Sequence, residues 1–341
     1  MLQNTKTTLD RYNPEKPLQV GGQAVIEGVM MRAPGRIATA VRRSNGEIVV
    51  KKKEYVSLAE KYKVFKLPIL RGAVGLVEMM YIGIDTLNFS AEVAMNDLEA
   101  EKKVKGNGTA AKKKKQPSHL QLALTVLVAL IIGIAIFFVT PLFLATNFFN
   151  AEQDALTFNL ITGVIRISIL LLYLIGISYM SDVKRLFEYH GAEHKAVFTF
   201  ESQADLTVDD AKGFTRFHPR CGTSFILIVV VVAMLFFSLF DTLLIFFLGE
   251  INLPVRLLTH LPLIPLIGGI AYEVIRWTAR RSTTTLGKIL VSPGLWLQRV
   301  TTKEPDLAQL EVALIALRCA LGKDVITEVI HVSHASELVE V

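Results

Sequence analysis

Residues 120–149 read LQLALTVLVALIIGIAIFFVTPLFLATNFF, a run that contains no Asp, Glu, Lys or Arg. A helix needs about 20 apolar residues to span the hydrocarbon core of a bilayer. Because the run exceeds that length, it predicts a membrane-spanning helix. Pro141 predicts a kink near its end, or a return of the chain to the membrane interface.

Three further segments are long and apolar enough to span a membrane, and they are Leu160–Met180, Ser224–Leu248 and Leu253–Trp277. The chain has 341 residues, of which 51% are hydrophobic, and a mean hydropathy of +0.43, a value that soluble globular chains seldom reach. We therefore expect an α-helical multi-pass membrane protein with about four transmembrane helices in contact with the lipid bilayer, and with a small cytoplasmic β-rich N-terminal subdomain.

Basic residues gather at one side of the predicted spans. Lys112–Lys115 precede the first span, several Lys and Arg residues separate the second from the third, and Arg276, Arg280 and Arg281 follow the fourth. The connection between the first and second spans, at 150–159, contains no Lys or Arg. The positive-inside rule therefore predicts a cell-membrane protein with both termini in the cytoplasm. The net charge of +6 then serves orientation and contact with anionic lipid, and we expect no nucleic-acid partner.

The chain divides into segments around these spans. Their expected order is a flexible tail at 1–17, the β-rich subdomain at 18–58, an interfacial helix at 59–96, a charged linker at 97–119, two spans at 120–180, a cytoplasmic insert at 181–223, two spans at 224–281, and a cytoplasmic C-terminal segment at 282–341. Ser44-Asn45-Gly46 predicts a hairpin turn between Ile37–Arg43 and Glu47–Lys53. Gly21–Arg32 is too rich in glycine for an ordinary strand. Its glycines predict that other groups approach the backbone of this segment closely.

Charged residues recur every seven positions in the otherwise apolar helix predicted at Pro68–Met95, and they are Arg71, Glu78, Asp85 and Glu92. Such a repeat drifts by only about 20° per step on a straight helix, so it forms one narrow polar stripe. The stripe is either the water-facing side of a helix at the membrane surface or a set of groups pointing into a polar site. We favour the first alternative, and the charges disfavour a fifth span.

The segment Glu188–His194, which reads EYHGAEH, carries the clearest chemical pattern. On a helix, His190 and His194 lie on one face, where two imidazoles can share a divalent metal, most naturally zinc. Glu193 lies between them and could act as a general base toward a water molecule. The alternative is a polar helix end with two ordinary solvated histidines.

His218 and Cys221 follow in the same insert, separated by a turn that contains Pro219. Cysteine and histidine are favoured zinc ligands, so both residues are candidates for the same metal. Four protein ligands would make a closed structural site, whereas three would leave a position open for catalysis. Alternatively, Cys221 is a small buried thiol at the start of the third span.

Polar residues outside the insert have two interpretations. Glu27, Arg32 and Arg71 could orient a polar or anionic group of a substrate, or they could serve structure alone. Glu273 lies in the fourth predicted span, and we expect it to pair with Arg276 rather than to bind a metal.

The C-terminal segment is expected to begin irregularly, at Ser282–Val300. Glu304-Pro305-Asp306 is a helix-start signal, and apolar residues recur through Asp306–Leu321. We therefore predict an amphipathic helix there, packed on the core or on a partner.

Five separated motifs resemble the YqhQ-like bacterial family, and they are Val20–Arg32, the LPILRG run at 67–72, Tyr189–Lys195, His218–Ser224 and the PGLWLQR run at 293–299. The resemblance extends from Val20 to about Leu321. The family is catalogued as domain of unknown function 1385 and described as metal-dependent enzymes. The resemblance implies a multi-pass membrane protein in which the motif residues form the site.

Three hypotheses follow. The first is a membrane metalloenzyme with a cytoplasmic-face site, in which His190 and His194 bind a metal with His218 or Cys221 and Glu193 is the base, acting on a lipid-like or peptide substrate. The second is a non-catalytic scaffold or assembly factor with a structural metal or none, bound to a membrane protein partner or to a second copy of itself. A small transporter is disfavoured, because charge within the spans is nearly confined to Arg166, Arg256 and Glu273.

Overall fold

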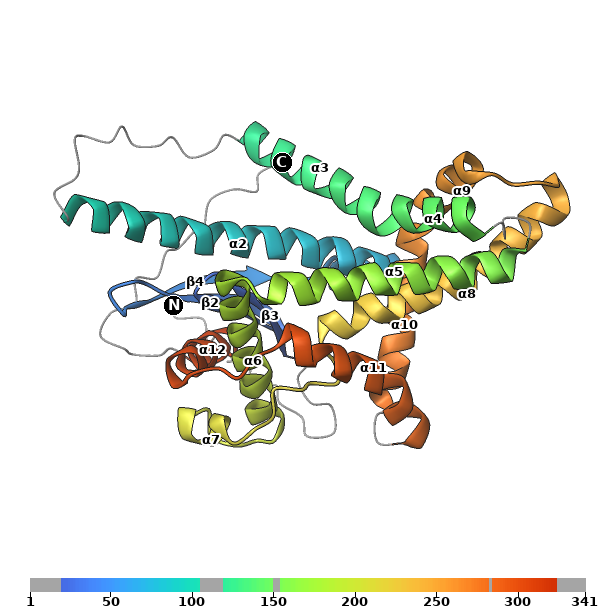
Figure 1. The fold of residues 1–341 in the computed structure, drawn as a ribbon. Helices are drawn as coiled ribbons and strands as arrows, with labels where there is room; N and C mark the ends of the chain where they lie inside the picture. Colours follow the sequence, from blue (N-terminus) through green and yellow to red (C-terminus); the bar gives the residue numbers. More distant parts are fainter. Residues whose placement is uncertain (1–19, 105–118, 150–153, 282–283, 324–341) are drawn as a thin grey trace.

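The computed structural model describes residues 20–104, 119–149, 154–281 and 284–323 (Figure 1). The strands are β1 (Gly21–Val25), β2 (Gly28–Ala33), β3 (Gly35–Arg42) and β4 (Ile48–Tyr55). The longer helices are α2 (Leu70–Val104), α3 (His119–Ile134), α4 (Thr140–Phe149), α5 (Ala155–Ser178), α6 (Ser181–Glu201), α8 (Gly222–Leu248), α10 (Ile264–Arg280), α11 (Thr285–Thr301) and α12 (Leu307–Ala320). The shorter ones are α1 (Leu58–Lys61), η2 (Lys63–Lys66), η3 (Ala135–Val139), α7 (Val208–Lys212), α9 (Leu253–His260) and η4 (Leu261–Leu263). The expected tail at 1–17 and Lys112–Lys115 lie outside the described residues.

Four helical segments of the described chain are long and apolar enough to cross a membrane, and they are Leu124–Phe149, Ala155–Ser178, Phe225–Leu248 and Leu253–Thr278. The prediction of an α-helical multi-pass membrane protein with a small N-terminal β-sheet is thereby confirmed. Helices α5 and α8 lie side by side, and α4 packs against α5 (Figure 1).

The irregularity predicted at Pro141 is a π-helical turn just before the proline. This turn, η3, precedes α4, and proline cannot donate the backbone hydrogen bond that the carbonyl of Phe137 would otherwise accept. Arg166 of α5 donates to that carbonyl instead, at 3.0 Å. A charged residue inside a span is thus used to satisfy a backbone group that the proline leaves open.

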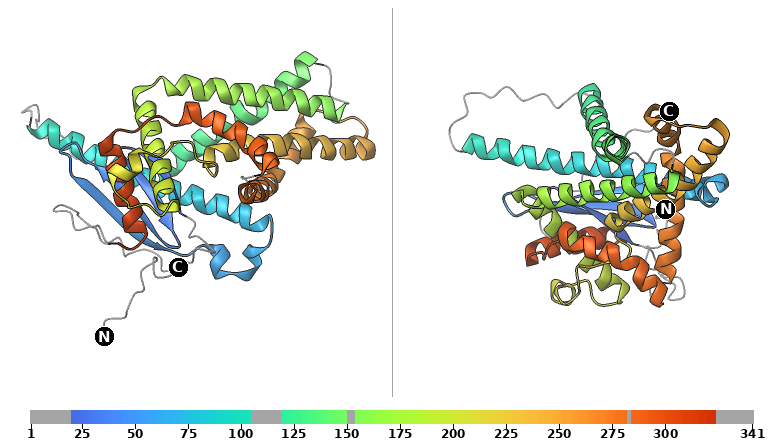
Figure 2. Two further views of the ribbon diagram at one scale, coloured as in Figure 1. Left: turned by 90° about the horizontal axis from the view of Figure 1, so that it is seen from below. Right: turned by 45° about the vertical axis from the view of Figure 1, so that its right-hand side comes forward.

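The fourth apolar segment is not one straight helix. It consists of α9, η4 and α10, and Pro254, Pro262 and Pro265 each lie at the start of one of these pieces, where a proline costs no hydrogen bond. Both views in Figure 2 and the view in Figure 1 show α10 crossing the direction of α5 and α8.

The sheet is antiparallel with the order β1-β2-β3-β4. The hairpin predicted around Ser44-Asn45-Gly46 is confirmed, since Arg42 pairs with Ile48 and Gly46 has a φ of 90°. Gly21–Arg32, which we did not expect to form ordinary strands, makes a second hairpin in which Ile26 and Glu27 are the two turn residues. Glu27, the second of these turn residues, has a φ of 52°, a left-handed conformation that is uncommon for residues other than glycine.

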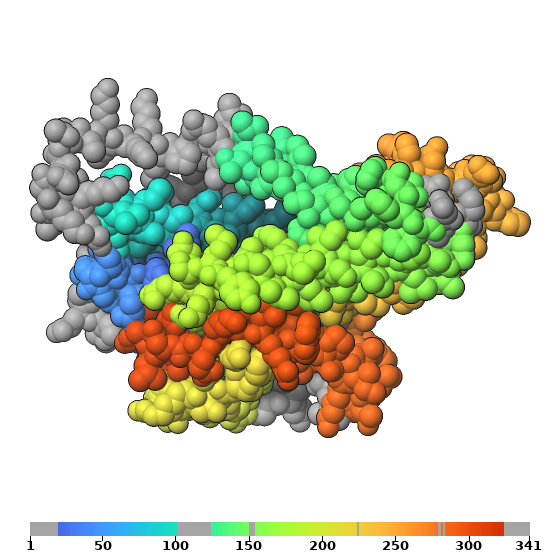
Figure 3. Space-filling view, viewed as in Figure 1, coloured from blue at the N-terminus to red at the C-terminus, as the bar shows by residue number. Residues whose placement is uncertain are grey.

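Helices cover both faces of the sheet. Val29 and Met31 point to the side of α6 and α12, while Met30 and Ile37 point to α2 (Figure 2). Helix α12 was expected to be amphipathic, but from Leu310 to Leu321 nearly every residue is buried between the sheet and α6. It is a core helix, because it has protein on both sides. In Figure 3, α5 and the α11–α12 segment cover much of the sheet from this side.

Three residues of the charged stripe of α2, Arg71, Glu78 and Asp85, contact protein, whereas Glu92 is exposed. The stripe as a whole is therefore not the water-facing side of the helix. Glu78 accepts hydrogen bonds from the Ser57 hydroxyl at 2.8 Å and from the Leu58 amide at 2.6 Å, and Asp85 accepts one from Lys51 at 3.1 Å. The exposed side of the helix is apolar instead, with Val77, Met80 and Tyr81 at least 60% exposed. Helix α2 also continues to Val104, into the segment expected to be a linker.

Glu273 pairs with Arg71 of α2, and the expectation that its partner is Arg276 is wrong. The Arg71 Nε atom donates to Glu273 Oε1 at 2.6 Å, and a second guanidinium nitrogen contacts Oε2. The Ile69 amide donates to the same carboxylate at 3.4 Å. These contacts join α2 to α10 and leave neither Arg71 nor Glu273 available to a distant site.

The segment expected to be irregular, Ser282–Val300, contains the helix α11. The Thr284 hydroxyl caps its N-terminus by accepting a hydrogen bond from the Gly287 amide at 3.1 Å. Pro293 lies inside this helix without ending it. One side of α11 packs on α8 and α5, and this contact carries its C-terminal end to the histidine motif.

Candidate metal centre

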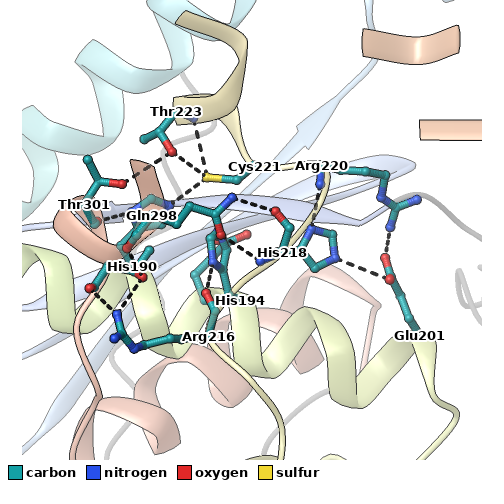
Figure 4. Close-up of polar contacts among 12 residues, drawn as sticks. His190, His194, Glu201, Arg216, His218, Arg220, Cys221, Thr223, Gln298 and Thr301 are labelled. Carbon is teal, nitrogen blue, oxygen red and sulfur yellow. Dashed lines mark hydrogen bonds and ion pairs between the residues drawn. The ribbon is translucent and has the colours of Figure 1, made fainter. Parts of the chain in front are cut away.

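His190, His194 and Cys221 converge in the interior (Figure 4). One donor atom from each lies within 4.8 Å of the others, and Cys221 Sγ is 3.2 Å from His190 Nε2. The two histidines come from successive turns of α6, and their ring centroids are 4.5 Å apart. Cys221 is the residue that caps the N-terminus of α8. The alternative of solvated histidines is wrong, since His194 is 2% exposed and His190 is partly buried.

Both imidazoles are oriented by backbone carbonyl groups. His190 Nδ1 lies 2.8 Å from the Thr301 carbonyl oxygen, and His194 Nδ1 lies 2.5 Å from that of Arg216. A carbonyl oxygen only accepts, so each Nδ1 carries a proton, and in the neutral form of either ring Nε2 presents a lone pair. His194 Nε2 is buried and makes no hydrogen bond. This arrangement is typical of metal-ligating histidines, whose other ring nitrogen donates to a carbonyl or carboxylate.

The sulfur of Cys221 contacts the first turn of α8. It accepts from the Thr223 amide at 3.5 Å and lies 3.1 Å from the Thr223 hydroxyl. The N-terminus of a helix carries a partial positive charge, which stabilises an anion placed there. The thiolate is the form of cysteine that binds metals.

Glu193 is buried beside the two histidines and is 6% exposed. Gly22 of β1 makes room for it, because a Cβ atom at that position would lie 2.8 Å from Glu193 Cγ. Burial raises the pKa of Glu193, against the opposing effects of His190, His218 and the Gly22 amide. Burial also lowers the pKa of His194, which keeps its imidazole neutral. Glu193 Oε2 lies 3.4 Å from His194 Nε2, so the carboxyl borders the same space as the three donor atoms.

His218 lies at the margin of this cluster. Its ring centroid is 5.7 Å from that of His194, and both of its nitrogens have partners. Nδ1 accepts from the Arg220 amide at 3.2 Å, and Nε2 lies 3.4 Å from Glu201 Oε2. The described residues therefore bring together three ligand candidates, His190, His194 and Cys221, and leave His218 outside the group.

The structure does not bring Glu27, Arg32 or Arg71 to this cluster. Glu27 lies at the β1–β2 turn, where it pairs with Arg185 and accepts from the Tyr189 hydroxyl at 3.3 Å. Arg32 lies on the α2 side of the sheet, with its guanidinium 4.7 Å from the centre of the Tyr55 ring. These residues attach the sheet to its covering helices, and Arg71 joins α2 to α10.

The residues that position His190, His194 and the neighbouring His218 were not predicted from the sequence. Gln298 of α11 holds the His218 backbone by two 2.8 Å hydrogen bonds, accepting from its amide and donating to its carbonyl. Thr301 and Arg216 contribute through their carbonyl oxygens, for which no side-chain pattern exists. The one available signal was the PGLWLQR motif, which contains Gln298.

A second buried polar cluster lies within the predicted spans and was also missed. Asp241 of α8 contacts Arg256 and His260 of α9 and Asn159 of α5, and all four side chains are at most 4% exposed. Charge in the spans is therefore not confined to Arg166, Arg256 and Glu273. Buried ionisable groups at membrane depth are costly unless paired, and here they are paired.

Gly191, in the middle of the histidine motif, allows α6 to lie against the chain before α12. A Cβ atom there would clash with the carbonyl oxygen of Lys303, whose amide donates to Phe187 at 2.8 Å. We expect Gly191→Ala to lower the free energy of unfolding by about 1–3 kcal/mol, as overpacking does. Thermal unfolding in detergent measures the change. Gly176→Ala is the control, because a Cβ atom on this α5 glycine meets nothing and should raise stability by up to about 1 kcal/mol. Equal effects of the two substitutions would contradict the packing explanation.

The fold and the cluster define a class: an α-helical multi-pass membrane protein with a four-stranded sheet and a His/His/Cys group where α6 meets the start of α8. The chain belongs to the family described as "Protein of unknown function (DUF1385)", whose model matches residues 67–323. It is 34% identical over 329 residues to "Uncharacterized protein YqhQ" of Bacillus subtilis (strain 168), covering 92% of this chain and 95% of that protein. No solved structure matches. The resemblance seen in the motifs is confirmed. The expectation that the family consists of metal-dependent enzymes is not supported, because the matching family description assigns neither a metal nor an activity.

Proposed function

We propose that this chain is a metal-dependent membrane enzyme whose metal is held by His190, His194 and Cys221. The observation that carries the proposal is the buried Nε2 atom of His194, which makes no hydrogen bond although its ring is fixed by a carbonyl on the other side. Leaving a buried polar atom without a partner costs about 1–3 kcal/mol, so such atoms call for an explanation. Coordination of a metal supplies the missing partner.

The donor set favours zinc. Two imidazole nitrogens and one thiolate are borderline-soft ligands, and catalytic zinc sites commonly use three protein ligands. Bound there, the metal would supply a Lewis acid to a substrate carbonyl or phosphoryl group. The remaining chemistry belongs to the chain. Glu193 would take up and return a proton at Oε2, the carboxylate oxygen that borders the cluster.

The reaction class that fits these roles is hydrolysis of a lipid-like or peptide substrate at the membrane. The basic residues that flank the spans support a site on the cytoplasmic side of the cell membrane, with both termini on that side. The joint between α6 and the start of α8 lies beside the spans, so a substrate held in the bilayer would meet the site near the membrane surface.

A structural metal in a non-catalytic scaffold is the second candidate, and burial favours it. Cys221 is 7% exposed, and Glu193 and His194 are less exposed still. A closed site would need a fourth ligand, and Glu193 is the nearest candidate to His194 Nε2. In that case Glu193 would be needed to retain the metal, whereas a general base would not.

Metal analysis of detergent-purified protein tests the proposal. We expect about one zinc per chain in the wild type, and a loss of most of it in His190→Ala and in His194→Ala, because each removes one of three ligands. His218→Ala is the matched control and should keep its metal, since both ring nitrogens of His218 bind other groups.

Glu193→Gln separates the two candidates. For an enzyme, the variant keeps its metal and fold but does not restore a phenotype that the wild type restores. For a scaffold, it loses metal or restores the phenotype fully. Absence of metal from freshly purified wild-type protein would overturn both forms of the metal proposal.

A further inference from the structure

Residues 56–67, which make up most of the connection between β4 and α2, are rich in apolar side chains and yet exposed. They include the short helices α1 and η2, which bury none of their residues. Five of the six large apolar side chains within residues 56–67 are between 42% and 62% exposed, and they are Val56, Leu58, Tyr62, Val64 and Leu67. The sixth, Phe65, is partly buried. A contiguous set of this kind on a protein surface marks an interaction site.

Lysines alternate with these apolar side chains. Lys61, Lys63 and Lys66 are exposed, and Glu60 is the one acidic residue in the connection. The ammonium group of Lys61 lies 5.4 Å from the centre of the Tyr62 ring. Cores of protein–protein interfaces are depleted in lysine, whereas membrane-surface segments combine lysine with aromatic and aliphatic side chains. The charge pattern therefore fits a bilayer with anionic headgroups better than a protein partner.

The connection is fastened to an apolar segment that is itself long enough to span the membrane. Ile69 has a φ of 68°, an outlier conformation for a β-branched residue. Gly269 of α10 accommodates it, because a Cβ atom there would lie 2.6 Å from Ile69 Cγ2. Glu273 accepts from the Ile69 amide and binds Arg71, so the turn into α2 is held in place at both ends.

This turn explains the LPILRG motif, which the metal centre does not use. Gly72 of the motif also approaches α10 closely, since a Cβ atom there would lie 2.7 Å from Tyr272 Cβ. Through Ile69 and Gly72, the motif packs the end of the connection directly against the Leu253–Thr278 segment. On the other side of the turn, the exposed apolar residues of α2, among them Val77 and Met80, continue the same surface.

We propose that residues 56–67 form a lipid-binding element. Its apolar side chains enter the bilayer beside α10, and Lys61, Lys63 and Lys66 bind the phosphate groups of anionic lipids. Among the described residues, the lipid-binding element and the metal centre share no contacts. The LPILRG turn contacts α10, whereas the His/His/Cys group lies on α6 and at the start of α8 and contacts α11.

A fluorophore on the element tests the apolar contact. Val64→Cys is labelled with an environment-sensitive thiol dye, and the protein is reconstituted in phosphatidylcholine vesicles containing phosphatidylglycerol and a nitroxide-labelled lipid. We expect strong quenching at this position. Asn45→Cys, in the exposed β3–β4 turn at the end of the sheet far from the spans, should be quenched little (Figure 1). Wild-type protein carried through labelling reports any background from its own buried cysteines. Equal, weak quenching at both positions would overturn the proposal.

Titration with phosphatidylglycerol tests the lysines. The labelled protein in a neutral detergent is titrated with this lipid, with and without Lys63→Gln and Lys66→Gln together. Each lysine near an anionic surface contributes about fivefold in affinity, so the double variant should bind about 25-fold more weakly. Lys184→Gln with Lys212→Gln removes the same charge from exposed positions on α6 and α7 and should change the affinity little. A similar loss in both pairs, or none in either, would show that headgroup binding at this element does not occur.

Discussion

Asp241→Leu is expected to lower the free energy of unfolding by about 3–5 kcal/mol, the usual cost of removing one partner from a buried ion pair. Asp241 is fully buried and is the only acidic member of its cluster. Its carboxylate accepts from Asn159 Nδ2 at 2.8 Å and lies 2.8 Å from His260 Nε2, and it pairs with Arg256. Without it, a guanidinium and an imidazole would remain at membrane depth with no counter-charge.

The aromatic surroundings of the cluster make this loss hard to avoid. The Arg256 guanidinium lies 3.8 Å from the centre of the Phe158 ring, and the His260 ring stacks on Phe237 at 3.7 Å. These contacts hold the guanidinium and the imidazole where they are, so neither can turn toward water without unpacking α5, α8 and α9. Since proteins have only about 5–15 kcal/mol of stability in total, a large part of the variant should fail to fold.

Two controls isolate the charge effect. Asp209→Leu makes the same chemical change at a side chain that is 88% exposed, and its solvent-screened ion pair with Lys212 should contribute little to stability. Combining Asp241→Leu with Arg256→Met and His260→Phe should recover much of the loss, because apolar replacement of a whole buried network is often nearly neutral. Unfolding in one detergent gives all three values. If Asp241→Leu and Asp209→Leu lower the free energy of unfolding by the same amount, the cluster is not a stabilising network.

The elements that the sequence predicted well depend on local patterns. The four apolar runs specify spans by length alone, and the turn at Ser44-Asn45-Gly46 specifies its hairpin because glycine supplies the positive φ that the turn needs. Helix α11 was missed for a related reason. Gly287, Pro293 and Gly294 are weak helix formers, but Gly287 and Gly294 are buried in a helix that packs on α8, α5 and α10.

Pairings between distant segments were beyond local patterns. Glu273 was assigned to Arg276, its neighbour on the same helix, whereas its partner is Arg71, which lies two hundred and two positions away in the sequence. The four residues of the Asp241 cluster come from three helices, and each alone looks like an isolated polar residue in an apolar run. The His190–His194 spacing could be read because one helix carries both rings. The choice of Cys221 over His218 depends on how α8 begins, which spacing does not encode.

Cys221→Ala is expected to remove most of the stabilisation that zinc gives to the folded protein, an expectation that rests on the proposed metal centre. A ligand present at about 1,000 times its Kd stabilises the folded state by about 4 kcal/mol. Loss of one of three protein ligands should raise the Kd by more than the 10–100-fold that outer-shell changes cause. At a hundredfold, the same zinc concentration would stabilise the variant by only about 1.4 kcal/mol.

Thermal unfolding with and without a zinc chelator measures this difference. Wild-type protein should unfold at a lower temperature after chelation and recover when zinc is restored, whereas Cys221→Ala should show a much smaller response. Cys319→Ala is the matched control, because Cys319 is the other cysteine of the chain and is buried in α12, away from the two histidines. It removes a thiol from the core at a similar packing cost, so its response to zinc should equal that of the wild type. If the two cysteine variants respond alike, Cys221 is a packing residue and the thiolate of the proposed ligand set must be abandoned.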